Sequence, residues 1–274
     1  MPPDQILSRI VPVLAEVPGV AAVVLGGSRA RGTANDASDY DIGLYFSTVQ
    51  PLDTGRLLEV AKAFADAADT VEVTPVGGWG TWIVGGAWLG VDGHKVDLLY
   101  RNLDDVARVI EACRGGEIAM HYQAGHPHGF CSAIWMGEVA LSRPLHDPGK
   151  MLAGLKAKTA LYPAPLRKAL IERFQWEILF AIENAELCVA RGEQTHIAGC
   201  VYRALACLAQ VLFALNERYL INEKGALQEA ATFPRTIPKL PARVDAIWRA
   251  IGETEVAAAL ASMRTIERDL KALS

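Results

Sequence analysis

The sequence predicts an α/β (α+β) domain with a mixed sheet over residues 1–149, followed by an all-α helical bundle over residues 150–274. Two observations predict this division. Short apolar runs with strand character alternate with helical segments in the first part, whereas the second part contains long helical segments joined by short loops. The chain has 274 residues, 51% hydrophobic and 21% charged, so it holds enough apolar side chains for two globular domains of ordinary size.

Four elements are predicted before residue 70, namely two helices with apolar residues on one side and two apolar strands. They are helix Asp4–Leu14, strand Val20–Leu25, strand Tyr40–Phe46 and helix Thr54–Ala68. A hairpin follows, because the strand-like segments Trp88–Val91 and Lys95–Tyr100 flank Asp92-Gly93, which is a strong turn signal. The spacing of apolar residues then predicts a helix over Leu103–Cys113. This mixture is typical of a small α/β sheet domain.

The second part is predicted to begin after a linker, Arg143–Gly149, which contains two prolines. Four helices are predicted beyond it: Pro165–Arg191, Thr195–Tyr219 with Thr195 as its N-cap, Val244–Ile251 and Glu253–Leu273. Residues 197–215 form the longest apolar stretch, and Arg203 lies inside it. We interpret the stretch as a buried bundle helix rather than a membrane span. An apolar bundle of this kind is also compatible with a homodimer.

The charge distribution narrows the classes of partner. The net charge is -4, but the first 150 residues carry eleven lysines and arginines against eighteen acidic residues, and residues 151–274 carry sixteen against thirteen. No general basic surface is visible, so a nucleic acid is not the expected partner. An acidic first part is better suited to metal ions and cationic small substrates. Five scattered cysteines without a CxxC pair, and no signal pattern in the first thirty residues, predict a cytoplasmic protein with reduced thiols.

The segment from Leu25 to Thr33 carries the first chemical signal. The predicted strand ends at Gly26 and Gly27, where glycine lets the backbone approach a ligand closely and the following N–H groups point outward at the start of a helical turn. Gly27 and Ser28 are therefore predicted to hold phosphate oxygens, and Arg29 directly after them is predicted to contact the phosphates as well. An ordinary strand-to-helix turn is the alternative for the glycines, and a role at the sheet edge is the alternative for Arg29.

Three carboxylates carry the second signal. Asp39 and Asp41 are two residues apart and are expected to face the same way, while their apolar neighbours face the other. Asp97 stands alone in an apolar strand, where an acid is costly without a partner, and it joins the other two if the strands are neighbours. Adjacent carboxylates repel unless a cation lies between them, so one or two Mg2+ ions are predicted on Asp39, Asp41 and Asp97, bridging a nucleotide triphosphate. Asp97 is either a metal ligand or the base that accepts a hydroxyl proton.

The order Gly27-Ser28, ten intervening residues, Asp39-x-Asp41 and a downstream Asp97 resembles the polymerase-beta-type nucleotidyltransferase superfamily. The helical part resembles the C-terminal bundle of bacterial aminoglycoside adenylyltransferases. The resemblance implies a two-metal site and magnesium-dependent transfer of AMP from ATP, or of the nucleotide of another nucleoside triphosphate. The acceptor would be a hydroxyl of a small, aminoglycoside-like molecule, pyrophosphate would be released, and the role would be antibiotic resistance. It also implies that Lys224 touches the nucleotide phosphates. The antibiotic enzymes often carry Glu as proton acceptor, whereas this chain offers Asp97.

Two other functions are compatible with these motifs. In the first, the acceptor is a protein hydroxyl or the end of a tRNA, as in toxin–antitoxin systems. In the second, the domain is a non-catalytic nucleotide-binding module, although three mutually repelling carboxylates argue against this. No motif in the sequence indicates which nucleotide base is preferred.

Histidines and tryptophans in the middle of the chain complete the candidate residues. The spacing of the histidines is not that of a structural zinc site, so they are expected to line a cleft or to be exposed: His121, His126 and His128. The tryptophans of a glycine-rich stretch are predicted to pack in the core, with an aromatic lining for a base or sugar as the alternative: Trp79, Trp82 and Trp88.

Overall fold

The computed structural model describes residues 5–273, and these form two compact units. The first unit comprises the chain up to Glu111 together with His121–Phe130 and Trp135–Leu161. The second comprises Ala112–Met120, Cys131–Ile134 and the chain from Tyr162 onward. A mixed sheet in the first unit and a set of helices in the second confirm the predicted fold class.

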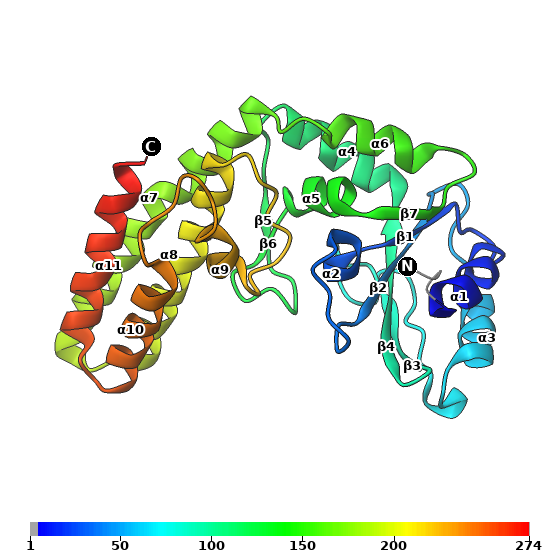
Figure 1. The fold of residues 1–274 in the computed structure, drawn as a ribbon, viewed down its shortest axis with the longest axis horizontal. Helices are drawn as coiled ribbons and strands as arrows, with labels where there is room; N and C mark the ends of the chain where they lie inside the picture. Colours follow the sequence, from blue (N-terminus) through cyan, green and yellow to red (C-terminus); the bar gives the residue numbers. More distant parts are fainter. Residues whose placement is uncertain (1–4, 274) are drawn as a thin grey trace. The chain divides into compact units, whose positions relative to one another are not determined.

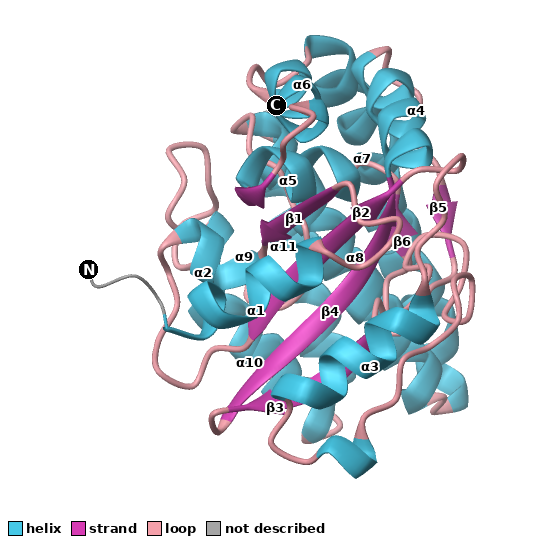
Figure 2. Ribbon diagram, turned by 90° about the vertical axis from the view of Figure 1, so that its right-hand side faces the viewer, coloured by secondary structure: helices cyan, strands magenta, loops and turns pink. Residues whose placement is uncertain are grey.

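A five-stranded sheet with the strand order β3-β4-β2-β1-β7 forms the centre of the first unit. Its strands are β1 (Ala22–Leu25), β2 (Tyr40–Phe46), β3 (Gly86–Val91), β4 (His94–Asn102) and β7 (Arg143–His146). β2 and β4 are parallel, and the other neighbouring pairs are antiparallel, so the sheet is mixed as predicted. Figure 2 shows β1, β2 and β4 side by side.

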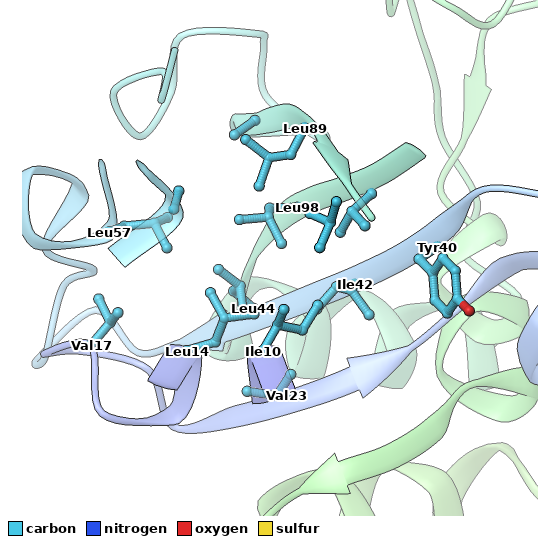
Figure 3. Packing of buried hydrophobic residues seen from close by; sticks show 14 of the residues in the cluster. Ile10, Leu14, Val17, Val23, Tyr40, Ile42, Leu44, Leu57, Leu89 and Leu98 are labelled. Atoms are coloured by element: carbon cyan, nitrogen blue, oxygen red, sulfur yellow. The ribbon is translucent and has the colours of Figure 1, made fainter. Parts of the chain in front are cut away.

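One face of this sheet is apolar and carries the core of the unit. Two helices contribute to the core, α1 (Gln5–Ala15) and α3 (Thr54–Phe64). Ile10 and Leu14 of α1 are fully buried and lie beside Val23, Ile42 and Leu44 of the strands (Figure 3). Full burial of one such side chain contributes ~1.5–3 kcal/mol. Because side chains alternate along a strand, this apolar layer fixes which residues of the same strands face the other way.

The predicted hairpin forms between β3 and β4. Asp92 and Gly93 occupy its turn with φ of 50° and 74°, a region that glycine enters freely and aspartate tolerates. The Asp66 carboxylate accepts hydrogen bonds from both turn amides, at 2.8 Å and 2.9 Å. The predicted helix α4 (Leu103–Arg114) follows β4 directly. The hairpin register is therefore well fixed, and with it the position of each β4 side chain.

The segment predicted as a linker contains a strand instead. Arg143–His146 forms β7, which pairs antiparallel with β1 at the edge of the sheet. Without β7, the buried strand β1 would leave its outer backbone groups without hydrogen-bond partners. Pro144 is tolerated there because an edge strand needs backbone donors on one side only. Two helices of the first unit flank β7, α5 (Ile134–Leu141) and α6 (Met151–Thr159).

The second unit is a helical bundle (Figure 1). Its helices are α7 (Ala164–Cys188), α8 (Gln194–Leu215), α9 (Ala226–Ala230), α10 (Leu240–Gly252) and α11 (Val256–Lys271). The N-cap of α8 is Glu193 rather than the predicted Thr195. Among the described residues, α8 is the one helix long and apolar enough to cross a membrane, but 72% of its apolar window is buried inside the fold. Shorter elements complete the chain: α2 (Gly27–Arg31), β5 (Met120–His121), β6 (Phe130–Cys131), η1 (Ala68–Thr70) and η2 (Val189–Arg191).

The arginine inside the apolar stretch of α8 has a partner on α7. Glu177 is 3% exposed, and its carboxylate oxygens pair with Arg203 at 2.5 Å and with Arg173 at 3.3 Å. Removing either charge from a buried pair leaves the other uncompensated, which is costly. Arg203 and Glu177 are therefore explained by the packing of the bundle itself.

Candidate active site

The candidate site lies on the sheet face opposite the apolar core. Asp41 of β2 and Asp97 of β4 are directly opposite each other in the parallel pairing of these strands. Their strand neighbours Ile42 and Leu98 are fully buried in the core, so the two carboxylates point to the other side. Asp39 precedes β2 by one residue and acts electrostatically on Asp41. The structure thus brings together the three acids that the sequence singled out.

Asp41 lies at the centre of this cluster. Its pKa is raised from 3.8 to about 6, first by burial and then by the negative charges of Asp97, Glu138 and Asp39. The Arg101 guanidinium opposes this rise. A carboxylate held in this way repels its neighbours when ionised, and a cation between them would remove the repulsion. The donor atoms are carboxylate oxygens, which suit a hard divalent cation.

Glu138 and Arg101 belong to the site although sequence reasoning did not select them. Arg101, near the end of β4, is 6% exposed and donates a 3.2 Å hydrogen bond to the Tyr100 carbonyl. Its guanidinium lies 4.9 Å from the ring centroid of Trp135 and 3.5 Å from Glu138 on α5. Glu138 is a lone charge in an apolar segment, which is the same signal that selected Asp97. That signal would have found Glu138, whereas Arg101 is followed by Asn102 and Asp104 and does not stand out in the sequence.

The glycine turn after β1 comes into close contact with the acids. The Gly26 amide donates a 2.7 Å hydrogen bond to the Asp41 carbonyl, and Gly27 and Ser28 begin the short helix α2. Gly27 has a φ of 59°, and a Cβ there would lie 1.8 Å from Asp41 Oδ2. Only glycine therefore allows the turn to approach this carboxylate. The first N–H groups of a helix have no intrahelical acceptor, which is the basis of the predicted phosphate contact.

Arg29 is held by the loop that carries Asp39. Its guanidinium donates to the Ser38 carbonyl at 2.7 Å and to the Asp39 carbonyl at 3.2 Å, and it lies 3.8 Å from the Tyr40 ring centroid. These contacts fix the backbone just before β2. Arg29 thereby positions the loop that carries Asp39, and its predicted contact with phosphate stays a prediction.

Lys224 lies in the second unit and is exposed. Its backbone amide donates a 2.8 Å hydrogen bond to Asn222 Oδ1 at the turn before α9. Its contact with nucleotide phosphates stays a prediction. His121 is exposed as expected and lies 4.9 Å from the Trp82 ring, whereas His126 and His128 are buried.

Metal-free protein should lose stability as pH rises from about 4 to about 6. Asp41 has a pKa of about 6 in the folded chain against 3.8 as its ordinary value, so between these values the folded state binds more protons than the unfolded state. Stability then falls with rising pH, by ~2 kcal/mol between pH 4.5 and pH 7. Urea unfolding in EDTA at both pH values should show this component in the wild type and not in Asp41→Asn. An identical pH dependence in both proteins would contradict it.

Replacing Arg101 should raise the pKa of Asp41 further. Arg101→Met removes the one cation that lowers this pKa and leaves Glu138 without its partner, so we also expect a loss of ~1–3 kcal/mol in unfolding free energy. Arg101→Lys keeps the charge and should keep most of the effect on Asp41. Carboxyl 13C NMR titration of metal-free protein measures the pKa directly. An unchanged Asp41 titration in Arg101→Met would refute the electrostatic role.

Comparison with known proteins supports the class of the domain. Residues 8–74 match the family described as Polymerase beta, Nucleotidyltransferase, a range that contains Gly27, Ser28, Asp39 and Asp41. This segment therefore resembles a nucleotidyltransferase-type domain, in agreement with the motif predicted there. A search of curated proteins gives no match. One similar solved structure is a nucleotidyltransferase-like protein from Exiguobacterium sibiricum 255-15, at 12% identity and a TM-score of 0.43, covering 95% of this chain and 72% of that one.

Proposed function

We propose that the protein is a magnesium-dependent nucleotidyltransferase that transfers AMP from ATP to a hydroxyl of a small molecule. The observation that carries the proposal is the pairing of Asp41 with Asp97 on adjacent parallel strands, next to the glycine turn that contacts Asp41. The turn and Asp41 lie within the region that matches the nucleotidyltransferase family.

The residues of the site divide into two groups. Asp39, Asp41 and Asp97 would hold two Mg2+ ions, which supply charge neutralisation at the transferring phosphate when bound. Gly27 and Ser28 would hold the β- and γ-phosphates through their backbone amides. Arg29 and Lys224 are proposed as further phosphate contacts.

The transfer step proceeds by direct displacement. The oxygen of the acceptor hydroxyl forms a bond to the α-phosphorus, and the bond from that phosphorus to the oxygen bridging to the β-phosphate breaks. The bridging oxygen and its electron pair leave with pyrophosphate. The hydroxyl proton goes to the Asp97 carboxylate if Asp97 is the base, and to solvent if Asp97 is a metal ligand only.

The acceptor is proposed to be a small, aminoglycoside-like molecule. Support comes from the excess of acidic residues in the first 150 positions and from the cluster of four carboxylates formed by Asp39, Asp41, Asp97 and Glu138. We also propose that the protein acts in the cytoplasm, because its five cysteines are free thiols.

Pyrophosphate release tests the proposal directly. Each of the four nucleoside triphosphates is supplied with Mg2+, with and without a panel of aminoglycosides and cyclic polyols. We expect release that needs ATP and one class of acceptor. Nucleotide binding without release would instead favour the non-catalytic module. Transfer of label from ATP to a protein or RNA in cell extract would favour a macromolecular acceptor.

A further inference from the structure

A pair of stacked tryptophans stands on the same sheet face as the carboxylates. Trp88 of β3 is 67% exposed, contrary to the expectation that it packs in the core. Its ring lies 4.5 Å from that of Trp79 with 21° between the planes. Leaving a ring of this size in water forgoes a large apolar burial, so an exposed, ordered tryptophan stack is informative.

The stack is held by buried polar contacts. Gln123 is 4% exposed, donates a 3.1 Å hydrogen bond from Nε2 to the Trp79 carbonyl, and accepts one of 3.4 Å from the Ile83 amide. The Trp79 ring fills the space over Gly86, where a Cβ would lie 2.8 Å from ring atoms. The backbone of Trp79 is thus held by Gln123 and its ring packs over Gly86, and the ring supports one face of Trp88.

The position of Trp88 relative to the acids follows from the strand register. Trp88 is directly opposite Asp97 in the antiparallel β3–β4 pair, so both side chains point to the same face. Asp97 is in turn opposite Asp41, and the Gly26 amide bonds to the Asp41 carbonyl. The glycine turn, Asp41, Asp97 and Trp88 therefore form one row across four neighbouring strands. With strands ~4.8 Å apart, Trp88 lies ~10 Å from Asp41 along this row.

We propose that Trp88, backed by Trp79, binds the acceptor by stacking on a ring that carries the reactive hydroxyl. The inference rests on the proposed function. In an in-line displacement the entering and leaving oxygens lie on opposite sides of the phosphorus. With the leaving pyrophosphate at the glycine turn and the phosphorus over Asp41, the entering hydroxyl is at Asp97. The rest of the acceptor then extends along the row onto Trp88.

The chemistry of the platform defines the class of acceptor. The flat face of an indole ring packs against the C–H face of a saturated sugar or cyclitol ring, and this contact does not depend on charge. Binding to Trp88 should therefore change little with salt, unlike binding of a cation by the carboxylates. A nucleobase of the donor stacked on Trp88 is the competing arrangement, and it is an outcome of the test.

The test compares Trp88→Ala and Trp88→Phe with Trp248→Ala, which alters a partly exposed tryptophan on α10. With an acceptor from the aminoglycoside and polyol panel, we expect Trp88→Ala to raise the acceptor KM at least tenfold at unchanged ATP KM. Trp88→Phe should restore most of the affinity, and Trp248→Ala should behave as wild type. An unchanged acceptor KM in Trp88→Ala, or a matching rise in the ATP KM, overturns the proposal.

A binding measurement separates failure of the platform from failure of the proposed function. Protein labelled with 5-fluorotryptophan, with the Trp88 signal assigned from Trp88→Phe, is titrated with kanamycin and with myo-inositol in the presence of Mg2+ and a non-hydrolysable ATP analogue. A 19F shift of the Trp88 signal with either ring compound supports the platform even if no pyrophosphate is released. A shift with the ATP analogue alone, or none with any ring compound, overturns it.

Discussion

Asp41→Asn should release pyrophosphate at least 10³-fold more slowly than the wild-type protein, a loss of ~4 kcal/mol of transition-state stabilisation. Asp41 lies between Asp97 and the glycine turn, so its carboxylate faces both the proposed metals and the proposed triphosphate. The amide side chain has the same shape but lacks the charge that a divalent cation needs. Calorimetric titration with Mg2+ and ATP should show weakened binding of the ion in the same variant.

The loss of activity in Asp41→Asn must be distinguished from unfolding of the protein and from a general effect of removing a negative charge. The pKa of Asp41 is raised by burial and then by its acidic neighbours, so Asp41→Asn removes a buried charge and its repulsion and should leave the metal-free protein at least as stable at pH 7. Asp36→Asn removes an exposed carboxylate from the loop before β2 and should keep full activity. A variant at Asp41 that retains activity would exclude this carboxylate from the reaction.

Local pattern was sufficient to predict the elements around the site. The strand Tyr40–Phe46 was predicted with its observed bounds, because its alternating side chains separate an apolar face from Asp41. The hairpin of β3 and β4 was predicted from Asp92-Gly93, whose backbone requires positive φ. Such signals are contained in a few consecutive residues, and the family match agrees with the motif that they position.

The pairing of strands that are far apart in the sequence could not be predicted from such local signals. That β4 lies parallel to β2 depends on a contact across more than fifty residues, and only this register places Asp97 beside Asp41. β7 was mistaken for a linker because the prolines of Arg143–Gly149 indicate a loop, whereas an edge strand tolerates the one proline that it contains, Pro144. Trp88 was placed in the core for its size, but its alternation with the buried Ala87 and Leu89 puts it on the other face. The size and apolar character of Trp88 predicted burial, whereas its place in the alternation of β3 leaves it exposed.

Gly27→Ala should reduce activity at least 10²-fold although no charged residue is replaced. The new methyl group would lie 1.8 Å from Asp41 Oδ2, which is far inside contact distance, so either the Asp41 carboxylate or the turn must move. Displacement of ~1 Å at a catalytic group is enough for a loss of this size. Steady-state pyrophosphate release and Mg2+ titration both report the displacement, and the Mg2+ affinity should fall along with the rate.

Gly32→Ala is the matched control for this substitution. Gly32 also has a positive φ, 71°, but a Cβ at that position meets nothing within 4 Å. Both variants therefore carry the same backbone strain, ~1 kcal/mol in unfolding free energy, and only Gly27→Ala carries the collision with Asp41. We expect Gly32→Ala to keep near wild-type activity despite its lower stability in urea. Equal losses of activity in the two variants would show that backbone strain, and not the close approach of the turn to Asp41, makes glycine necessary at position 27.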